Sequence, residues 1–319
     1  MLNLDHLINF KKYLAKPGKK IKLKDFDTDY DGKTLSKRDA EALLSLGLQK
    51  LSETQDMLYA HNRYSVLIIF QAMDAAGKDS AVKHVMTGFN PQGVRVYSFK
   101  SPSEQELDHD YLWRHYKALP SRGEICIFNR SHYENVLVTR VHPEYILNEH
   151  LPGIDSVSKI TDSFWKERYK QISRFERNIA ENGTIILKFF LHISKKEQKK
   201  RFLERIDDAT KNWKFSLGDL KERTYWNEYQ RAYEEAIEET SKDYAPWFIV
   251  PADDKWCTRL IIAGIISKQF QKLSLHYPTL NESQKAELKK ARLQLMSEKE
   301  GNNSAEKVKK KKVQPKEVK

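Results

Sequence analysis

The 319-residue sequence predicts an α/β fold, a three-layer α/β/α sandwich around a five-stranded parallel sheet. Five short apolar runs recur along the chain, and several are apolar on both faces, as strands buried in a parallel sheet are. Amphipathic helical stretches separate the runs, which implies right-handed crossovers between neighbouring strands. The runs, in chain order, are residues 65–73, 94–100, 124–130, 184–193 and 247–252.

The rest of the chain is assigned around this core. Leucines recur at helical intervals over residues 35–60, so residues 1–60 are expected to form an N-terminal helical extension packed on the core. No internal repeat or Pro/Gly-rich linker follows, so residues 61–298 are expected to form one catalytic domain. From residue 301 the apolar residues fall to three Val and one Ala, which predicts a disordered basic tail over 299–319.

Composition narrows the class of protein. No apolar run approaches 18 residues and the N-terminus lacks a signal-peptide core, so we expect a cytoplasmic protein without membrane spans. The two cysteines exclude a disulfide framework and a cysteine zinc site. The net charge is +12. Residues 301–319, with seven Lys and two Glu, contribute +5 of it. A basic body indicates a polyanionic partner.

The segment QAMDAAGKDS, residues 71–80, follows the first apolar run and precedes a helical stretch. Backbone N–H groups at a helix N-terminus bind phosphate, and a lysine adds a mobile positive charge. The usual loop reads G-x-x-x-x-G-K-[ST], whereas Ala72 stands in place of the first glycine here. Asp74 would repel phosphate unless it carried Mg²⁺. An ordinary strand-to-helix turn is the alternative to a phosphate site built from Ala75, Ala76, Gly77, Lys78, Asp79 and Ser80.

The third apolar run delivers a second polar cluster at its carboxyl end, where ligands bind in open α/β sheets. Arg130 is a planar fork that can grip phosphate oxygens, and Asn129 and Glu134 lie beside it in the sequence. Arg140 follows two to three helical turns later and is a candidate for the same cleft, with a surface ion pair as its alternative. His132 is expected to be structural, because nothing in the sequence positions it as a nucleophile or metal ligand.

Residues 192–223 hold ten basic and six acidic residues, and the helical pattern breaks near residue 207. This predicts a helical lid over about residues 200–223 that closes over a phosphate site. In this basic stretch we expect function from Arg201, Arg205 and Lys214. Lys195, Lys196, Lys199 and Lys200 are expected to form a solvated face. The aromatic stretch 108–120 is expected mostly to pack the core, with Trp113 and Arg114 as candidates for a purine pocket.

Six blocks of the chain resemble the polyphosphate kinase family 2 in order and spacing, from about residue 22 to 275. The blocks are DAAGKD at 74–79, FNPQGVRVYSFKSPSEQE at 89–106, YLWRHYKALP at 111–120, GEICIFNRSHYENV at 123–136, KKRFLERIDDATKNWKFS at 199–216 and PWFIVPADDKW at 246–256. The resemblance implies a P-loop-kinase-like fold. It also implies phosphoryl transfer between inorganic polyphosphate and the nucleotides AMP, ADP and ATP, with Mg²⁺, or Mn²⁺ in its place.

The resemblance also assigns roles to individual residues. Asp74, Gly77 and Lys78 stand in the places of the family's x-D-x-x-G-K loop, with Asp74 holding the metal. Arg130 matches the arginine after the third strand. Asn129 stands where many members carry Asp, which resembles the class that accepts both AMP and ADP. The polyphosphate chain is expected along the lid, at Arg201, Arg205, Lys211 and Lys214.

These residues predict direct in-line transfer without a phosphohistidine intermediate, in which positioning and charge neutralisation do most of the work. The sequence leaves open whether transfer also runs in reverse. The alternatives are an ATP-dependent nucleoside monophosphate kinase, an inactive P-loop regulator and a basic nucleic-acid-binding protein. Specific RNA binding usually needs aromatic residues on an exposed sheet, and these strands look buried, so no specific nucleic-acid partner is expected. A homo-oligomer is expected.

Overall fold

The computed structural model describes residues 9–30, 36–87 and 89–298. The chain forms two units, Met1–His276 and Tyr277–Lys319. The second contains helix α12, Glu282–Ser297, which begins with a capping box at Asn281. The basic tail predicted for 299–319 lies outside the described residues. The other predicted domain boundaries, at residues 60 and 298, stay a prediction.

The first unit is built on a sheet of six described strands in the order β1-β6-β5-β2-β4-β3. The five strands expected from the sequence all pair in parallel, which confirms the predicted core. β2 and β5 lie at the centre, and every residue of β2 is buried. The five are β2 (Ser65–Ala72), β3 (Val94–Ser98), β4 (Ile125–Asn129), β5 (Thr184–His192) and β6 (Trp247–Pro251).

The sixth strand was not expected. β1, Leu14–Ala15, adds antiparallel to the edge of β6, so the sheet is mixed. Among the described residues of the expected N-terminal helical extension, those from Lys37 onward form an α-helix. The described residues before Lys37 include two short 3₁₀ turns, η1 and η2, and the strand β1. The backbone N–H groups of Ile21 and Leu23 donate to Glu238 and Glu234 of another helix at 3.0 and 2.7 Å. These long-range partners replace the local hydrogen bonds of a helix.

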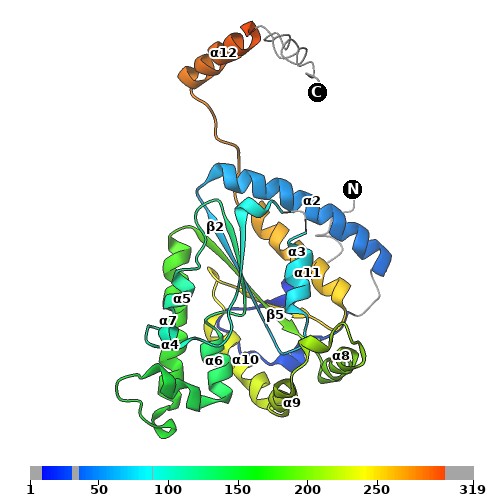
Figure 1. The fold of residues 1–319 in the computed structure, drawn as a ribbon, viewed down its shortest axis with the longest axis vertical. Helices are drawn as coiled ribbons and strands as arrows, with labels where there is room; N and C mark the ends of the chain where they lie inside the picture. Colours follow the sequence, from blue (N-terminus) through cyan, green and yellow to red (C-terminus); the bar gives the residue numbers. More distant parts are fainter. Residues whose placement is uncertain (1–8, 31–35, 88, 299–319) are drawn as a thin grey trace, which may run out of the picture. The chain divides into compact units, whose positions relative to one another are not determined.

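Helices cover both faces of the sheet, which confirms the three-layer architecture (Figure 1). One layer contains α2 (Lys37–His61), α3 (Lys78–Val85) and α11 (Lys255–Gln271), and the other contains α6 (Glu134–Val141), α7 (Asp162–Glu181) and α10 (Trp226–Thr240). No helix in the described ranges is long and apolar enough to span a membrane.

Shorter elements connect these layers. The predicted lid corresponds to α8 (Lys195–Asp207), η6 (Asn212–Lys214) and α9 (Leu217–Thr224), which follow β5. The other short helices and turns are η1 (Phe10–Tyr13), η2 (Leu23–Asp25), η3 (Pro91–Gly93), α4 (Glu104–Leu107), α5 (Trp113–Tyr116), η4 (Pro143–Glu149) and η5 (Val157–Lys159).

The N-terminal turn η1 packs into the core through Phe10, which is 5% exposed. Its ring lies so close to Gly264 of α11 that a Cβ atom at residue 264 would overlap it. Phe10→Ala should therefore lower the free energy of unfolding by about 3 kcal/mol or more, the usual cost of emptying a phenylalanine site. Urea unfolding measures this change. Leu46→Ala on the exposed face of α2 is the control, with a change within about 0.5 kcal/mol. Equal losses in both would contradict the packing of η1 on the core.

Candidate active site

The first part of the site is the turn between β2 and α3, residues 73–77, which we call the phosphate loop. Ala75 and Gly77 both have positive φ, at 60° and 101°, and α3 begins immediately afterwards at Lys78. Glycine adopts such angles at little cost, which explains Gly77 at the N-cap position. The turn thus presents the first backbone N–H groups of an eight-residue helix at the carboxyl end of the central strand.

The Lys78 side chain folds back over this turn. Its Nζ atom donates to the carbonyl oxygen of Ala72 at 2.8 Å. Burial lowers the pKa of Lys78, the nearby Arg130 guanidinium lowers it further, and Asp74 opposes the shift. A buried ammonium beside a second cation gains much from an anionic ligand, because that ligand would offset both effects.

The second part of the site is the turn after β4. Arg130 has φ 63°, and its N–H donates to the carbonyl oxygen of Phe70 in β2 at 3.1 Å. Its guanidinium lies 3.5 Å from the Asp74 carboxylate of the phosphate loop. Glu134 opens helix α6 four residues later, and burial raises its pKa while Arg130 opposes the rise. The two predicted loops therefore meet across neighbouring parallel strands.

Asn129, the last residue of β4, faces the phosphate loop. Its side-chain amide donates to Asp79 at 2.7 Å and to Ser98 at 3.4 Å. Ser80, the residue after Asp79, accepts a hydrogen bond from Arg259 of α11 at 2.8 Å. Both polar residues that follow Lys78 are thus held by side chains from other elements.

Two cavities open at this place and share part of their lining. The inner cavity, about 450 Å³, extends from Asp74 and Lys78 towards Glu134 and Tyr233. The lid cavity, about 920 Å³, extends from the phosphate loop towards the lid helices. The lining residues common to both are Asp74, Lys78, Lys100, Ser101 and Arg130.

The two cavities differ in chemistry. Eight basic side chains and four carboxylates line the lid cavity, so it carries a positive excess. The inner cavity has nearly balanced charges, with apolar and aromatic side chains between them. Its basic residues include Arg114 and Arg223, and its apolar and aromatic lining includes Leu107, Leu137, Val138, Tyr145 and Tyr229.

Arg201 touches the lid cavity but its donors face the protein. Its Nη1 atom donates to the carbonyl oxygens of Ala75 and Ala76 at 3.1 and 2.9 Å. Its Nη2 atom donates to Ala252 and Asp253 at 2.7 and 2.8 Å, and Nε donates to Glu197 at 2.9 Å. With all five donors engaged and 4% exposure, Arg201 braces the phosphate loop from behind. This placement differs from the expected contact with a ligand.

The other predicted lid residues have looser partners. Arg205, Lys211 and Lys214 all line the lid cavity. Arg205 lies 3.7 Å from Asp219, Lys211 lies 2.6 Å from the half-buried Asp208, and Lys214 lies over the ring of Trp213. Lys211 and Lys214 are exposed and Arg205 is half-buried, and their role in a lid stays a prediction.

Two of the predicted nucleotide-binding residues line neither cavity. Arg140 forms ion pairs with Glu235 at 3.0 Å and Asp162 at 3.6 Å, which favours the ion-pair alternative. Trp113 stacks on His109 and carries the Lys117 ammonium 3.3 Å from its ring centre. Arg114, in contrast, does line the inner cavity.

Sequence reasoning missed several lining residues, among them Lys100, Arg223 and Tyr233. Lys100 lies two residues after the end of β3, so the rule that sites lie at the carboxyl ends of strands could have identified it. Arg223 of α9 is the last residue of the basic stretch 192–223, but no feature of the sequence distinguishes it there, and no motif surrounds Tyr233 of α10. Only the packing of these helices over the turn after β4 brings them to the cavity.

The chain is similar to several known proteins. The model of the polyphosphate kinase 2 family matches residues 34–277. The ADP-polyphosphate phosphotransferase of Rhodopseudomonas palustris is 48% identical over 289 residues, which cover 91% of this chain and 99% of the relative. The AMP/ADP-polyphosphate phosphotransferase of Meiothermus ruber is 45% identical over 272 residues, 84% of this chain and 95% of its own. The crystal structure of polyphosphate kinase 2 from Arthrobacter aurescens TC1 superposes with a TM-score of 0.77 at 37% identity, covering 87% of this chain and 98% of that one.

Arg201→Lys tests the bracing of the phosphate loop. A lysine has three donors in place of five and leaves buried carbonyl groups unpaired, each at about 1–3 kcal/mol, so the free energy of unfolding in urea should fall. Arg205→Lys is the matched control, because the contacts of Arg205 are long and it is more exposed, and it should change stability by less than about 0.5 kcal/mol. Equal stability of the two variants would contradict the bracing role.

Proposed function

This chain belongs to the polyphosphate kinase 2 family, and from that premise we propose that it transfers phosphoryl groups from inorganic polyphosphate to AMP and ADP, giving ADP and ATP. One observation carries the proposal. Two cavities of different chemistry meet at Asp74, Lys78 and Arg130, so that two phosphate-bearing substrates can approach each other there. The names of the relatives support the same substrates.

Polyphosphate is assigned to the lid cavity. A chain of phosphates carries charge along its whole length, and the positive excess of this cavity extends from the phosphate loop to Arg205, Lys211 and Lys214. A protein surface of one sign attracts the opposite polyion through many weak contacts. The end of the chain would lie on the N–H groups at the start of α3, next to Lys78.

The nucleotide is assigned to the inner cavity. Its volume of about 450 Å³ and its mixed apolar and polar lining suit a small molecule with one polar end. The phosphate of AMP or ADP would face Arg130 and Lys78, and the nucleoside would extend towards Leu107, Val138 and Tyr145. Arg223 and Arg114 are further candidates to hold its phosphates.

The transfer itself is in-line. An ionised oxygen of the acceptor phosphate forms a bond to the terminal phosphorus as the bridging P–O bond breaks, and the polyphosphate leaves one unit shorter. The acceptor needs no general base because it is already ionised. Lys78 and Arg130 neutralise the oxygens of the transferred group, which is the main form of catalysis in phosphoryl transfer.

The site fits a divalent cation shared with the substrates. Mg²⁺ is usually held by one or two carboxylates together with substrate phosphates. Asp74 supplies such a carboxylate to both cavities, and the described residues contain no cluster of three or more His, Cys, Asp or Glu that would hold a metal alone. Mg²⁺ at Asp74, with Mn²⁺ as the alternative, would supply further charge neutralisation when bound.

A homo-oligomer and a cytoplasmic location remain predictions.

Helices cover both faces of the sheet, which argues against RNA recognition on an exposed sheet.

The direct test supplies purified protein with AMP, Mg²⁺ and long-chain polyphosphate, without ATP, and measures ADP and ATP by chromatography. Both nucleotides should accumulate. Lys78→Ala should slow transfer about 100- to 1000-fold, the usual cost of about 2.7–4 kcal/mol for losing one transition-state donor. Lys83→Ala, on the exposed face of α3, should have wild-type rates. Phosphorylation of AMP by ATP but not by polyphosphate would instead indicate a nucleoside monophosphate kinase.

Acceptor choice is tested at Asn129. Asn129→Asp would place a second carboxylate against Asp79, where the amide now donates at 2.7 Å, and the repulsion would change the charge where the two cavities meet. The ratio of kcat/KM for AMP to that for ADP should fall. Asn135→Asp is the control, because Asn135 lines the inner cavity and its amide donates to the carbonyl oxygen of His132 in its own helix turn. An unchanged ratio in Asn129→Asp would remove Asn129 from acceptor choice.

A further inference from the structure

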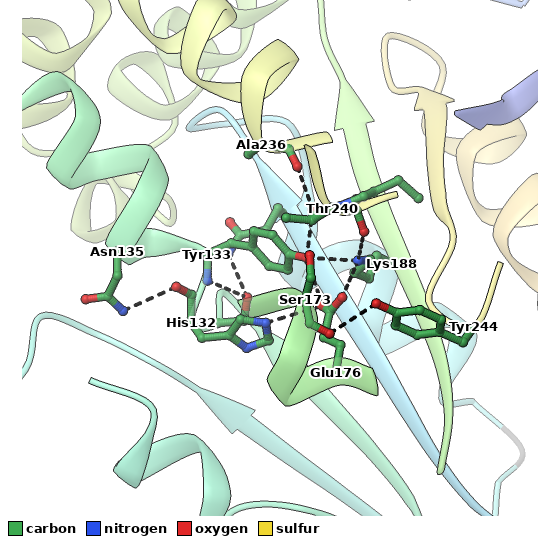
Figure 2. A network of polar contacts seen from close by, with 12 residues as sticks. His132, Tyr133, Asn135, Ser173, Glu176, Lys188, Ala236, Thr240 and Tyr244 are labelled. Atoms are coloured by element: carbon green, nitrogen blue, oxygen red, sulfur yellow. Dashed lines mark hydrogen bonds and ion pairs between the residues drawn. The ribbon is translucent and has the colours of Figure 1, made fainter. Parts of the chain in front are cut away.

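A buried polar cluster lies behind the active site, between β5 and helices α7 and α10 (Figure 2). At its centre are Lys188 of β5 and Glu176 of α7, whose side chains are both 0% exposed and lie 2.6 Å apart. The side chains of Tyr133 and His132, from the turn after β4, point towards this pair. Neither Lys188 nor Glu176 lines the two active-site cavities.

The hydrogen bonds of the pair are complete. Lys188 Nζ donates to Glu176, to the Tyr133 hydroxyl at 2.8 Å and to the carbonyl oxygen of Thr240 at 2.8 Å, which uses all three ammonium protons. The second Glu176 oxygen accepts from the Tyr133 hydroxyl at 2.8 Å and lies 3.4 Å from His132 Nε2. The hydroxyl oxygen of Thr240 accepts from Trp247 Nε1 at 2.9 Å and also lies 2.9 Å from the Tyr133 hydroxyl.

Stability alone is a weak reason for such a pair. Replacing a buried ion pair by apolar residues of similar volume is often neutral or stabilising, whereas removing one partner is strongly destabilising. The described core around the pair is otherwise largely apolar, with Phe189, Phe190 and Trp247 nearby in the sheet. An apolar pair would lose the contacts to Tyr133 and His132 and the hydrogen bond to the carbonyl oxygen of Thr240.

These two residues lie inside the turn that carries the active-site side chains. Arg130 precedes them in the left-handed region, and Glu134 follows them at the start of α6. A non-glycine residue keeps such a backbone conformation only when its surroundings fix it. Ser131 contributes on one side, because its hydroxyl oxygen accepts from Gln71 and from the N–H of Tyr133. The buried pair holds the other side through Tyr133 and His132.

We propose that the Lys188–Glu176 pair, acting through Tyr133, is a positioning element that fixes the turn at residues 130–134 and so aims Arg130 and Glu134 into the cavities. The effect of this positioning on the rate of phosphoryl transfer rests on the proposed function. Lys188, Glu176 and Tyr133 touch neither substrate site and act only through the turn. Small displacements of a charge that stabilises a transition state reduce the rate steeply.

Tyr133→Phe tests this directly, because it removes only the hydroxyl between the pair and the turn. We expect kcat for AMP phosphorylation to fall about tenfold, with KM for AMP and for polyphosphate within twofold of wild type, since an interaction made in the transition state is weakened. Tyr244→Phe is the matched control. Its hydroxyl also binds α7, donating to the carbonyl oxygen of Ser173 at 3.1 Å, but it does not contact the turn. The control should keep wild-type kcat.

A folded Tyr133→Phe variant with wild-type kcat would overturn the proposal, as would an equal loss in Tyr244→Phe. If single substitutions of the pair do not fold, the double variant Lys188→Met/Glu176→Leu should, because no charge is left unpaired. It should still show a reduced kcat, because the hydroxyl of Tyr133 has lost both ionic partners and keeps only the hydroxyl of Thr240. Wild-type kcat in the folded double variant would also refute the positioning role.

Hydrogen exchange separates this inference from the proposed function, because it needs no turnover. In Tyr133→Phe, amides of the peptide spanning residues 128–137 should exchange at least tenfold faster, while those of α7 stay unchanged. Unchanged exchange in the turn would overturn the anchor even in an active enzyme. Faster exchange in a protein whose wild type transfers no phosphoryl group would support the anchor and refute the function.

Discussion

The parallel pairing of β2 with β4 is the constraint on which the whole site depends. Its register places Phe70 opposite Asn129, and the N–H of Arg130 then donates to the carbonyl oxygen of Phe70. Both strands end at the same edge of the sheet, so their turns face each other and bring Arg130 within 3.5 Å of Asp74. A shift of one residue in this register would turn every side chain of one strand to the opposite face and separate the two turns.

This arrangement places the positive charges of Lys78 and Arg130 next to each other in a partly buried site, where their repulsion is poorly screened. Lys78 and Arg130 lie close enough for Arg130 to lower the pKa of Lys78, in addition to the effect of burial. The chain offsets part of this repulsion with Asp74 and Glu134, which both raise the pKa of Lys78. A phosphate ligand would replace those internal counter-charges, so the same charges that cost stability favour binding of the substrate.

The sequence predicted the parts of this site that depend on strand ends and helix starts. The buried strands, the glycine before Lys78 and the arginine after β4 follow from local patterns, and the family resemblance placed them in one cleft. The lid cations Arg205 and Lys214 were also predicted, but Arg201 was expected to face a ligand. The helical pattern places Arg201 and Arg205 on one face of a helix. Only the tertiary fold shows that Arg201 donates hydrogen bonds to carbonyl groups of two loops. The strand β1 and the cluster at Lys188 were missed for the same reason, because their partners lie far away in the sequence.

The basic residues in and behind the active site therefore form two groups, which differ in the internal contacts that each residue would lose on binding a polyanion. The donors of Arg201 bind backbone carbonyl groups, and the ammonium of Lys188 binds a buried carboxylate. Neither side chain can turn to a ligand without leaving buried groups unpaired. Lys211 pairs with the half-exposed Asp208, and ion pairs near the surface contribute only about 0–1 kcal/mol, while Arg205 lies 3.7 Å from Asp219. Exchanging such a carboxylate for a phosphate therefore costs little. The internal cations fix the phosphate loop and the turn after β4, while the surface cations remain available to follow a chain of changing length. A donor that shortens by one phosphate at every transfer needs this combination of a rigid reaction centre and an exchangeable channel.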